Sequence, residues 1–237
     1  MNLPNNESLT EALRRENTSL RGDLLTIARR ISHDLRTPLG GIITAGEAMQ
    51  ELLVETDPAS LPLVASSLSS AEELSQLIKR FSYIVKATAL PCPPQPMSMG
   101  EAVSVALERL HTRIIKHRVI IGEPDSWPEV NGVSDWLVVI WSNLLANALQ
   151  HAGTPPQIEL GWRVEKGKHE FWVSDNGPGV PEKERRTLFQ PFNTLHEADA
   201  PHGLGLSIVQ RLVELQSGYC GYKSNSQGGA CFFFGLP

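Results

Sequence analysis

Three residues with complementary chemistry stand close together in the segment SHDLRTPLGGI, which spans residues 32–42. His33 and Asp34 are adjacent, and Thr37 follows His33 by four residues, one turn of a helix. An imidazole beside a carboxylate is a nucleophile with a general base within reach. Because short motifs also arise by chance, the alternative is an ordinary exposed histidine on a kinked helix.

A polar stripe marks the second half of the chain. Asn143, Asn147 and His151 recur every four residues through an otherwise apolar segment, so on a helix they share one face. Asparagine is a poor helix former, and amide oxygens suit Mg²⁺ and phosphate. We therefore interpret these residues as ligands, with a pair of surface amides as the alternative.

A carboxylate followed by glycines is the third candidate feature. Asp175 ends an apolar strand pattern, and Gly177 and Gly179 follow it. A buried carboxylate there can accept a hydrogen bond from an adenine amino group, while glycines let a base approach the backbone. The alternative is a polar hairpin turn, in which Asp-Asn-Gly is common.

A second glycine pair opens an amphipathic segment. Gly203 and Gly205 precede an apolar repeat, and the backbone amides at a helix start suit a triphosphate. The pair follows a polar loop rather than a strand and lacks a downstream βαβ unit, so it is not a dinucleotide-binding fingerprint.

The first candidate residues require a long helix. Ser8 and Glu11 form a capping-box signature, and apolar residues then recur at helical spacing until a turn at Asp57, Pro58 and Pro62. A second apolar repeat follows, so the two segments predict an antiparallel helical hairpin. The apolar residues of the predicted coiled-coil or bundle seam are Leu9, Leu13, Leu20, Leu24, Ile27, Ile31 and Leu35 on the first helix and Val64, Leu68, Ala71, Leu74, Ile78, Phe81 and Val85 on the second. A lone hairpin leaves apolar surface exposed, which predicts a homodimer with a four-helix bundle.

The orientation of His33 follows from this seam. His33 lies two residues from both Ile31 and Leu35, about 200° around the helix axis, so it is expected to point outward. Pro38 removes one backbone hydrogen bond and permits a bend just beyond His33. Such a bend gives a second domain access to the imidazole.

The chain is expected to have two domains and a linker. Residues 1–88 form an all-α lead-in and hairpin, residues 89–98 a proline-rich linker, and residues 99–237 a mixed α/β domain. Helices are predicted over 98–117, 134–151 and 205–217, the last stopped by Gly218. Strands are predicted over 117–121, 157–165, 169–174, 219–225 and 230–236.

Composition excludes several classes. The net charge of −5 and pI near 5.8 argue against a nucleic-acid partner. No apolar run reaches the ~18 residues that span a bilayer, and the start of the chain does not resemble a signal peptide. Three cysteines without metal-ligand spacing argue against a disulfide framework. We expect a cytoplasmic protein with reduced thiols.

The motifs, taken in order, resemble one family. SHDLRTPLGGI resembles the phosphoacceptor box of two-component sensor histidine kinases. NLLANALQHA, DNGPGV, LFQPF, GLGLSIVQ and GGACFFFGLP resemble the successive nucleotide-binding boxes of their ATPase domain. That domain has the α/β sandwich (Bergerat or GHKL) fold also used by gyrase, Hsp90 and MutL. The resemblance covers nearly all of residues 20–237.

The resemblance implies an ATP-dependent protein-histidine kinase core that acts on a response regulator receiver domain. His33 would receive the γ-phosphoryl group of ATP, Asp34 would be its general base, and Thr37 would orient water in a phosphatase reaction. Asn147 would hold Mg²⁺ near Asn143. The remaining implied site residues bind adenine, shape the pocket or anchor a mobile lid over 181–202; they are His151, Asp175, Gly177, Gly179, Phe189, Phe192, Gly203, Leu204, Gly205 and Leu206.

Some residues depart from the family pattern. Gln150 replaces a usual lysine, Pro201 replaces a usual glycine, and NTLHE after Phe192 lacks a basic residue. Less positive charge near the phosphates predicts slow transfer, with Arg185 and Arg186 as the expected substitutes.

Two alternatives to the kinase remain at this stage. A histidine phosphotransfer or scaffold protein with a degenerate ATP domain would fit the departures, and another ATPase of the same fold would leave His33 unexplained. No sensor segment precedes residue 8, so we expect either a kinase that senses through a partner or a fragment of a longer one.

Overall fold

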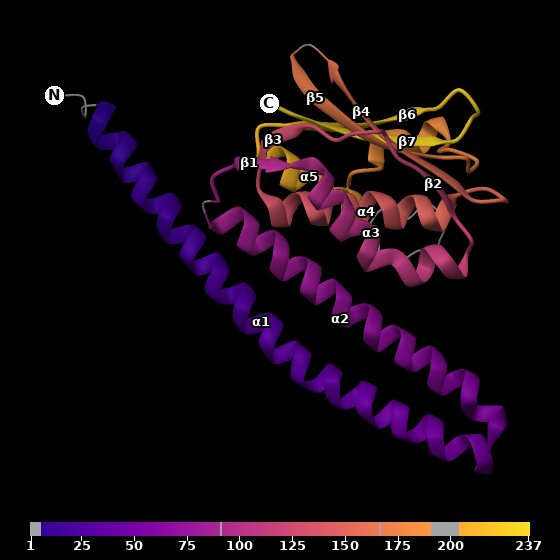
Figure 1. The fold of residues 1–237 in the computed structure, drawn as a ribbon. Coiled ribbons are helices and arrows are strands. Elements are labelled where there is room, and N and C mark those ends of the chain that lie inside the picture. The colour runs from indigo at the N-terminus through magenta and orange to yellow at the C-terminus, as the bar shows by residue number, and fades with distance from the viewer. Residues whose placement is uncertain (1–5, 91, 166, 191–203) are drawn as a thin grey trace. The chain divides into compact units, whose positions relative to one another are not determined.

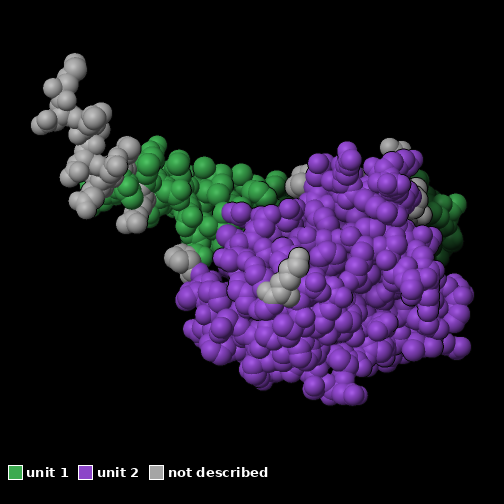
Figure 2. All heavy atoms as spheres, turned by 90° about the horizontal axis from the view of Figure 1, so that it is seen from above, with its two compact units in different colours: residues 1–91 green, residues 92–237 purple. Residues whose placement is uncertain are grey.

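The computed structural model describes residues 6–90, 92–165, 167–190 and 204–237 (Figure 1). The chain divides into two compact units, coloured separately in Figure 2. Residues 1–91 are called the helical unit, and residues 92–237 the sheet unit. No helix in the described part of either unit is long and apolar enough to cross a membrane.

The helical unit is the predicted hairpin. It contains α1 (Asn6–Thr56), the short 3-10 helix η1 (Pro58–Ser60) and α2 (Leu61–Ala89). α1 continues through Pro38, which lies inside it. Because α1 begins at Asn6, Ser8 lies within the helix and is not its N-cap, so the predicted capping box is wrong. The turn at Pro58 is confirmed.

The contact between α1 and α2 confirms part of the predicted seam, because Leu68, Ala71 and Ile78 of α2 are buried. Leu39 of α1 packs with Ala71 and Ile78 of α2, with Ile43 against them. At Gly46 the helices come so close that an added Cβ would lie 2.5 Å from Leu68 Cδ2. Gly46 and Ala71 allow the two backbones to approach, and larger side chains, Leu39, Leu68 and Ile78, fill the contact.

The larger apolar residues of α1 lie on another face. Ile27, Ile31 and Leu35 are 56%, 45% and 43% exposed in the single chain. The face that they form is centred about 80° around the axis from the buried line of Ala28, Ser32 and Leu39, with Leu35 nearest to that line and Ile27 farthest from it. The sequence pattern predicted one seam where the helix has two adjacent apolar faces.

The sheet unit has the predicted α/β architecture. A five-stranded sheet has the order β2-β4-β5-β7-β6, with β2 parallel to β4 and every other neighbouring pair antiparallel. β1 and β3 form a separate antiparallel pair. Figure 1 shows α3, α4 and α5 on one face of the larger sheet. The elements are β1 (Gln95–Ser98), α3 (Met99–Lys116), β2 (Ile120–Gly122), β3 (Glu129–Gly132), α4 (Ser134–His151), β4 (Gln157–Glu165), β5 (Lys168–Asp175), η2 (Glu182–Thr187), α5 (Gly205–Glu214), β6 (Tyr219–Ser224) and β7 (Ala230–Leu236).

Several boundaries differ from the prediction. The proline-rich linker is shorter than 89–98, because α2 continues to Ala89 and β1 already begins at Gln95. β1 and β3 were missed, since each has only four residues and β1 contains Pro96. α5 ends at Glu214, before the predicted 217.

The stop after α5 involves a different residue than predicted. Ser217, rather than Gly218, has the left-handed φ of +59°. Gly218 donates its N–H to Val213 O at 3.0 Å. A Cβ at Gly218 would overlap Gly235 O, so a close approach of two backbones requires this glycine.

An aromatic core fixes α4 on the sheet. Trp141 of α4 meets Phe234 of β7 edge-on with ring centroids 5.6 Å apart, and Phe171 of β5 stacks on Phe234 at 5.2 Å. Trp141 also donates its indole N–H to Met99 Sδ at 3.1 Å. All three rings are fully buried, and they hold the helix and the strand that carry the candidate site.

The other face of the sheet carries aromatic rings that lie over glycines of neighbouring strands. In each case the ring and the glycine are directly opposite in the strand register. A Cβ on any of these glycines would overlap the ring. The pairs are Trp172 over Gly161, Phe233 over Gly221 and Tyr219 over Gly235. The rings thus cover backbone that the glycines would leave open.

We expect Gly161→Ala to destabilise the sheet unit by about 2 kcal/mol, because the added methyl displaces the ring of Trp172. Gly122→Ala is the matched control, since Gly122 is also a strand glycine but has nothing within 4 Å of its added Cβ. All five tryptophans lie between residues 127 and 172, so their fluorescence during urea unfolding reports this unit. Equal losses in both variants would contradict the argument.

Candidate functional site

The phosphoacceptor candidates lie together on α1, as predicted. Nδ1 of His33 lies 3.2 Å from Oδ1 of Asp34, and the two side chains are 81% and 64% exposed. The Thr37 hydroxyl donates to the His33 carbonyl at 3.4 Å, one turn away. Contact at Nδ1 leaves Nε2 of His33 without a partner among the described residues. The imidazole therefore presents one bound and one available nitrogen.

Three faces of α1 separate the functions of its residues. The line of Ala28, Ser32 and Leu39 is buried, and Ser32 hydrogen-bonds with Ser82 of α2. His33 lies about 100° from Ser32 around the axis, on the side away from the exposed Ile31. The histidine thus occupies neither the hairpin contact nor the apolar face.

Asp175 is the electrostatic centre of the second candidate site. It ends β5 and is buried. Its Oδ1 accepts N–H groups from Gly177 at 2.9 Å and Ala230 at 3.3 Å. Its Oδ2 is buried with no hydrogen-bond partner among the described residues. Burial raises the pKa of Asp175, although both amides and the charge of His151 oppose that rise. A buried acceptor left open in this way calls for a donor from a ligand.

Glycines let the backbone pack tightly around Asp175. An added Cβ at Gly177 would overlap His151 O, and one at Gly229 would overlap the Asp175 carbonyl. Gly179 has a φ of +69°, which side chains with a Cβ rarely adopt. The two predicted glycines are therefore needed here, and Gly229 is a third that the prediction did not assign.

Two asparagines hold the end of β5 from opposite sides. Asn225 Nδ2 donates to the Asp175 carbonyl at 2.7 Å and to Ser174 Oγ at 2.9 Å, and its Oδ1 accepts the Gly229 N–H at 2.8 Å. Asn176 Oδ1 accepts the N–H groups of Gly153 and Gln157 at 2.9 and 3.0 Å.

Sequence analysis did not single out Asn225 or Asn176. Asparagine is common in turns for local reasons, so no local pattern indicates that the Asn225 side chain reaches residues 174 and 175.

The polar stripe of α4 meets the start of α5. Asn143 Oδ1 lies 3.1 Å from the position of an added Cβ on Gly205, the first residue of α5. Asn143 Nδ2 donates to Val139 O at 2.8 Å. Asn147 makes no hydrogen bond to a described residue and is half-buried. The structure thus brings the predicted stripe to the predicted glycine turn.

The beginning of the predicted lid packs against the sheet. Phe189 meets Phe232 edge-on at a centroid distance of 6.4 Å. Leu204 is buried and Leu206 half-buried at the start of α5. Phe192 and Gly203, with the rest of 191–203, lie outside the described residues.

Arg185 makes contacts that differ from its predicted role. Its Nε donates to Val180 O at 3.0 Å and its Nη2 to Ser224 Oγ at 3.2 Å. The guanidinium also lies 5.5 Å from the ring centroid of Tyr222. These contacts fasten η2 to β6, because a planar guanidinium combines hydrogen bonding with stacking. Arg185 is thus engaged in structure rather than available for phosphate.

Acidic and thiol ligands do not gather into a metal site. Within the described ranges, no group of three or more His, Cys, Asp or Glu side chains could hold an ion. An ion here would depend on the Asn147 amide oxygen together with the phosphates of a ligand.

Two family models match the chain. The His Kinase A (phospho-acceptor) domain matches residues 23–90, which include the His33–Asp34 pair. The histidine kinase-, DNA gyrase B- and HSP90-like ATPase matches residues 132–237, which include Asp175 and both asparagines of α4. The chain belongs to the sensor histidine kinases.

The histidine kinases that this chain matches in sequence are longer than the chain itself. It is 33% identical over 213 residues to the histidine-protein kinase/phosphatase MprB of Mycolicibacterium smegmatis, covering 83% of this chain and 41% of MprB. It is 28% identical over 210 residues to the methanogenesis regulatory histidine kinase FilI of Methanothrix harundinacea, covering 87% and 24%. The chain therefore spans less than half the length of these relatives.

Solved histidine kinases share the fold. Full-length ShkA in complex with AMPPNP superposes with a TM-score of 0.68 at 26% identity, covering 90% of this chain and 45% of ShkA. A structure of the mycobacterial sensor histidine kinase MprB gives a TM-score of 0.55 at 25% identity, covering 60% of this chain and 97% of that one.

We expect Asp175→Asn to stabilise the sheet unit at pH 7 and to abolish nucleotide binding. Burial raises the pKa of Asp175 above its unfolded value, so its ionisation costs stability at every pH above the raised pKa. That cost disappears as the pH falls toward the unfolded value of about 3.9. The difference in melting temperature between wild type and variant should therefore shrink to zero toward that pH.

Melting followed by tryptophan fluorescence at several pH values, with calorimetric titration of ATP, tests both effects. A variant that is less stable than wild type at pH 7, or that still binds ATP, would show that the carboxylate is not the open acceptor inferred here.

Proposed function

We propose that the protein is an ATP-dependent protein-histidine kinase that phosphorylates His33 and passes the phosphoryl group to an aspartate of a response regulator. The observation that carries the proposal is the exposed His33 with Nδ1 held by Asp34 and Nε2 available. This pair lies in a matched phosphoacceptor domain, in one chain with a matched ATPase domain.

The acceptor chemistry follows from the two nitrogens. Asp34 accepts a hydrogen bond from Nδ1–H of His33. This bond fixes the tautomer and makes Nε2 the nucleophile. Nε2 forms the bond to the γ-phosphorus as the bond to the bridging oxygen breaks, and ADP carries away the electron pair of that bond. Asp34 then stabilises the positive charge that develops on the imidazole.

Residues around Asp175 fit an adenine nucleotide. The open Oδ2 of Asp175 would accept a hydrogen bond from the adenine amino group, and Gly177 and Gly179 leave room beside the backbone. The α5 start at Gly205 would direct backbone amides at the phosphates. Bound Mg²⁺ would neutralise charge on the phosphates, held by Asn147. The similar full-length ShkA was solved in complex with AMPPNP, which supports this assignment.

We also propose that the helical unit forms a homodimer. Large apolar residues remain exposed along one face of α1 and on α2 in the single chain: Leu20, Leu24, Ile27, Ile31, Leu35, Ile42, Met49, Leu74 and Phe81. So long an exposed apolar stripe is a typical interaction surface. A second copy would bury it in a four-helix bundle and leave the His33 face open.

A phosphatase activity toward the regulator belongs to the same proposal. Thr37 lies one turn beyond His33 on the same helix, and its hydroxyl would orient water for attack on the phosphorylated regulator. The relative MprB is named as a kinase/phosphatase, which supports this part.

We expect His33→Gln to abolish acid-labile phosphorylation while nucleotide binding persists. Asp34→Asn should slow autophosphorylation by roughly 10²-fold, because it removes the base. Thr37→Ala should spare autophosphorylation but slow dephosphorylation of the regulator. Incubation with γ-labelled ATP, followed by mass spectrometry for phosphohistidine, measures these rates.

Label that persists in His33→Gln would overturn the assignment of the acceptor. ATP binding without any phosphohistidine in wild type would instead favour a phosphotransfer or scaffold protein with a degenerate ATP domain.

We expect Ile27→Asp to convert the dimer to a monomer, because it would bury an unpaired charge in the bundle. Val54→Asp is the matched control: Val54 is 58% exposed against 56% for Ile27, but it lies about 60° from His33 on the open face. Light scattering at micromolar concentration reports the mass. A wild-type monomer, or equal effects of the two variants, would refute the proposed interface.

A further inference from the structure

Positive charge exceeds negative charge around His33 on α1. Between residues 24 and 46 this helix has three arginines, Arg29, Arg30 and Arg36, and only one carboxylate, Asp34. All three arginines are exposed, and none pairs with an acidic side chain in the described part of the chain. Asp34 is directed to His33 Nδ1 instead.

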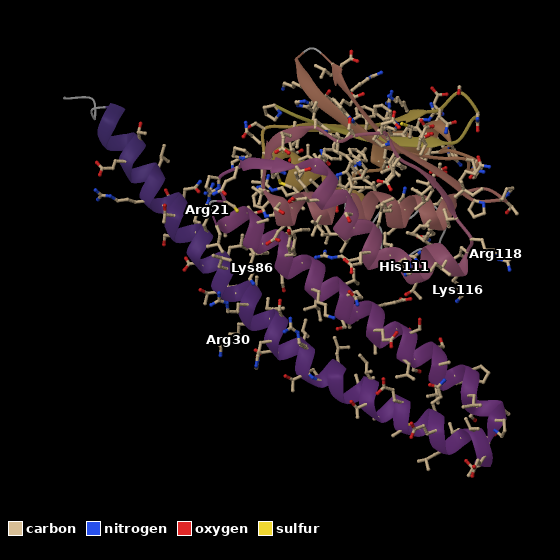
Figure 3. The ribbon with its side chains drawn as sticks, in the orientation of Figure 1. Arg21, Arg30, Lys86, His111, Lys116 and Arg118 are labelled. Atoms are coloured by element: carbon tan, nitrogen blue, oxygen red, sulfur yellow. The ribbon has the colours of Figure 1, made fainter. Side chains whose placement is uncertain are left out.

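Helix geometry places two of these arginines beside the acceptor. Arg29 and Arg30 precede His33 by four and three residues, so both flank it on the adjacent turn, about 40° and 60° to either side. Side chains on a helix lean toward its N-terminus, so the imidazole leans over the turn that holds them. Figure 3 shows Arg30 projecting from the side of α1 away from α2.

The facing helix adds no negative charge at this level. Ser32 is hydrogen-bonded to Ser82, so the part of α2 around residue 82 lies beside the part of α1 that carries His33. From residue 74 to 89, α2 has Lys79, Arg80 and Lys86 and no Asp or Glu. Apart from Asp34, the carboxylates of the hairpin lie before residue 24, at Glu7, Glu11, Glu16 and Asp23, or toward the turn, at Glu47, Glu51, Glu55, Asp57, Glu72 and Glu73.

The charges beside His33 favour an anionic ligand. Arg29 and Arg30 are adjacent, and Asp34 is the single carboxylate within one turn of either on this helix. The chain as a whole is acidic, with a net charge of −5, so a general excess of cations does not explain the cluster. A dianion bound at His33 would be attracted by both guanidinium groups.

We propose that Arg29 and Arg30 bind the phosphoryl group on His33, both as it arrives and once it is attached. The proposal rests on the proposed function, which makes Nε2 the acceptor. A guanidinium presents several N–H groups in a plane and forms charge-assisted hydrogen bonds to phosphoryl oxygens. Arg29 and Arg30 precede the segment SHDLRTPLGGI, whereas Arg36 lies inside it, on the C-terminal side of His33.

The test uses the full chain labelled at histidine with phosphoramidate, a small phosphoryl donor that needs no ATP site. Phosphorus NMR then gives the pH midpoint at which the phosphoryl group on His33 loses its last proton, and labelled His33→Gln identifies its signal. In Arg29→Gln/Arg30→Gln the midpoint should rise by about half a pH unit, since lost positive charge disfavours the dianion. Arg29→Lys/Arg30→Lys should retain most of the wild-type midpoint.

The matched control is Arg21→Gln, which removes an exposed arginine of the same helix about 18 Å before His33 and should leave the midpoint unchanged. Labelling with ATP gives a second readout: Arg29→Gln/Arg30→Gln should phosphorylate roughly tenfold more slowly at unchanged nucleotide affinity. These two measurements separate charge at the phosphoryl group from general damage to the helix.

Each outcome decides one question. A midpoint in Arg29→Gln/Arg30→Gln equal to that of Arg21→Gln overturns the inference. If the midpoint is equal and only transfer to a regulator is slowed, the arginines are instead a docking surface for an acidic protein. A shifted midpoint in a wild type that ATP never labels supports the inference and overturns the proposed kinase function.

Discussion

The sheet unit depends on a buried carboxylate that the protein itself only half satisfies. Two backbone amides bind one oxygen of Asp175, and the other oxygen has no partner in the described chain. Backbone segments pack so closely around Asp175 that Gly177 and Gly229 cannot accept side chains. The end of β5 is held in place by the aromatic core that packs on β5 and by the hydrogen bonds of Asn225, in the β6–β7 turn. A site built in this way trades stability for affinity.

In the helical unit the candidate reacting group is exposed rather than buried. His33 lies on an open face, where the large partners of the proposed function could reach it, and its environment is set by neighbours on the same helix. Because these side chains stay in contact with water, no single charged contact there is strong. In the proposed chemistry several weak contributions act together, with Asp34 acting on the imidazole and exposed guanidinium groups acting on the anion.

Sequence reasoning worked best where a single local pattern determines the structure. The bounds of α4, β4 and β7 were predicted correctly, because their apolar residues meet one continuous core. On α1 the apolar pattern separates into two faces: the small Gly46 allows close contact with α2, while the large side chains that dominate the periodicity stay exposed in the single chain. The clamp made by Asn225 and the engagement of Arg185 by β6 were beyond reach, because both depend on strands that pair far apart in sequence.

One hydrogen bond beside the acceptor has a mechanical consequence. The Ser32 hydroxyl donates to the Ala28 carbonyl at 2.6 Å, so the hydroxyl of Ser82 must be the donor to Ser32. Sliding α1 along α2 would separate the two hydroxyls and break this hydrogen bond, which costs about 1 kcal/mol. The side chain of Leu68, which fills the space beside Gly46, resists the same movement. A displacement along α1 is therefore transmitted to α2, so the two helices move together and His33 moves with them.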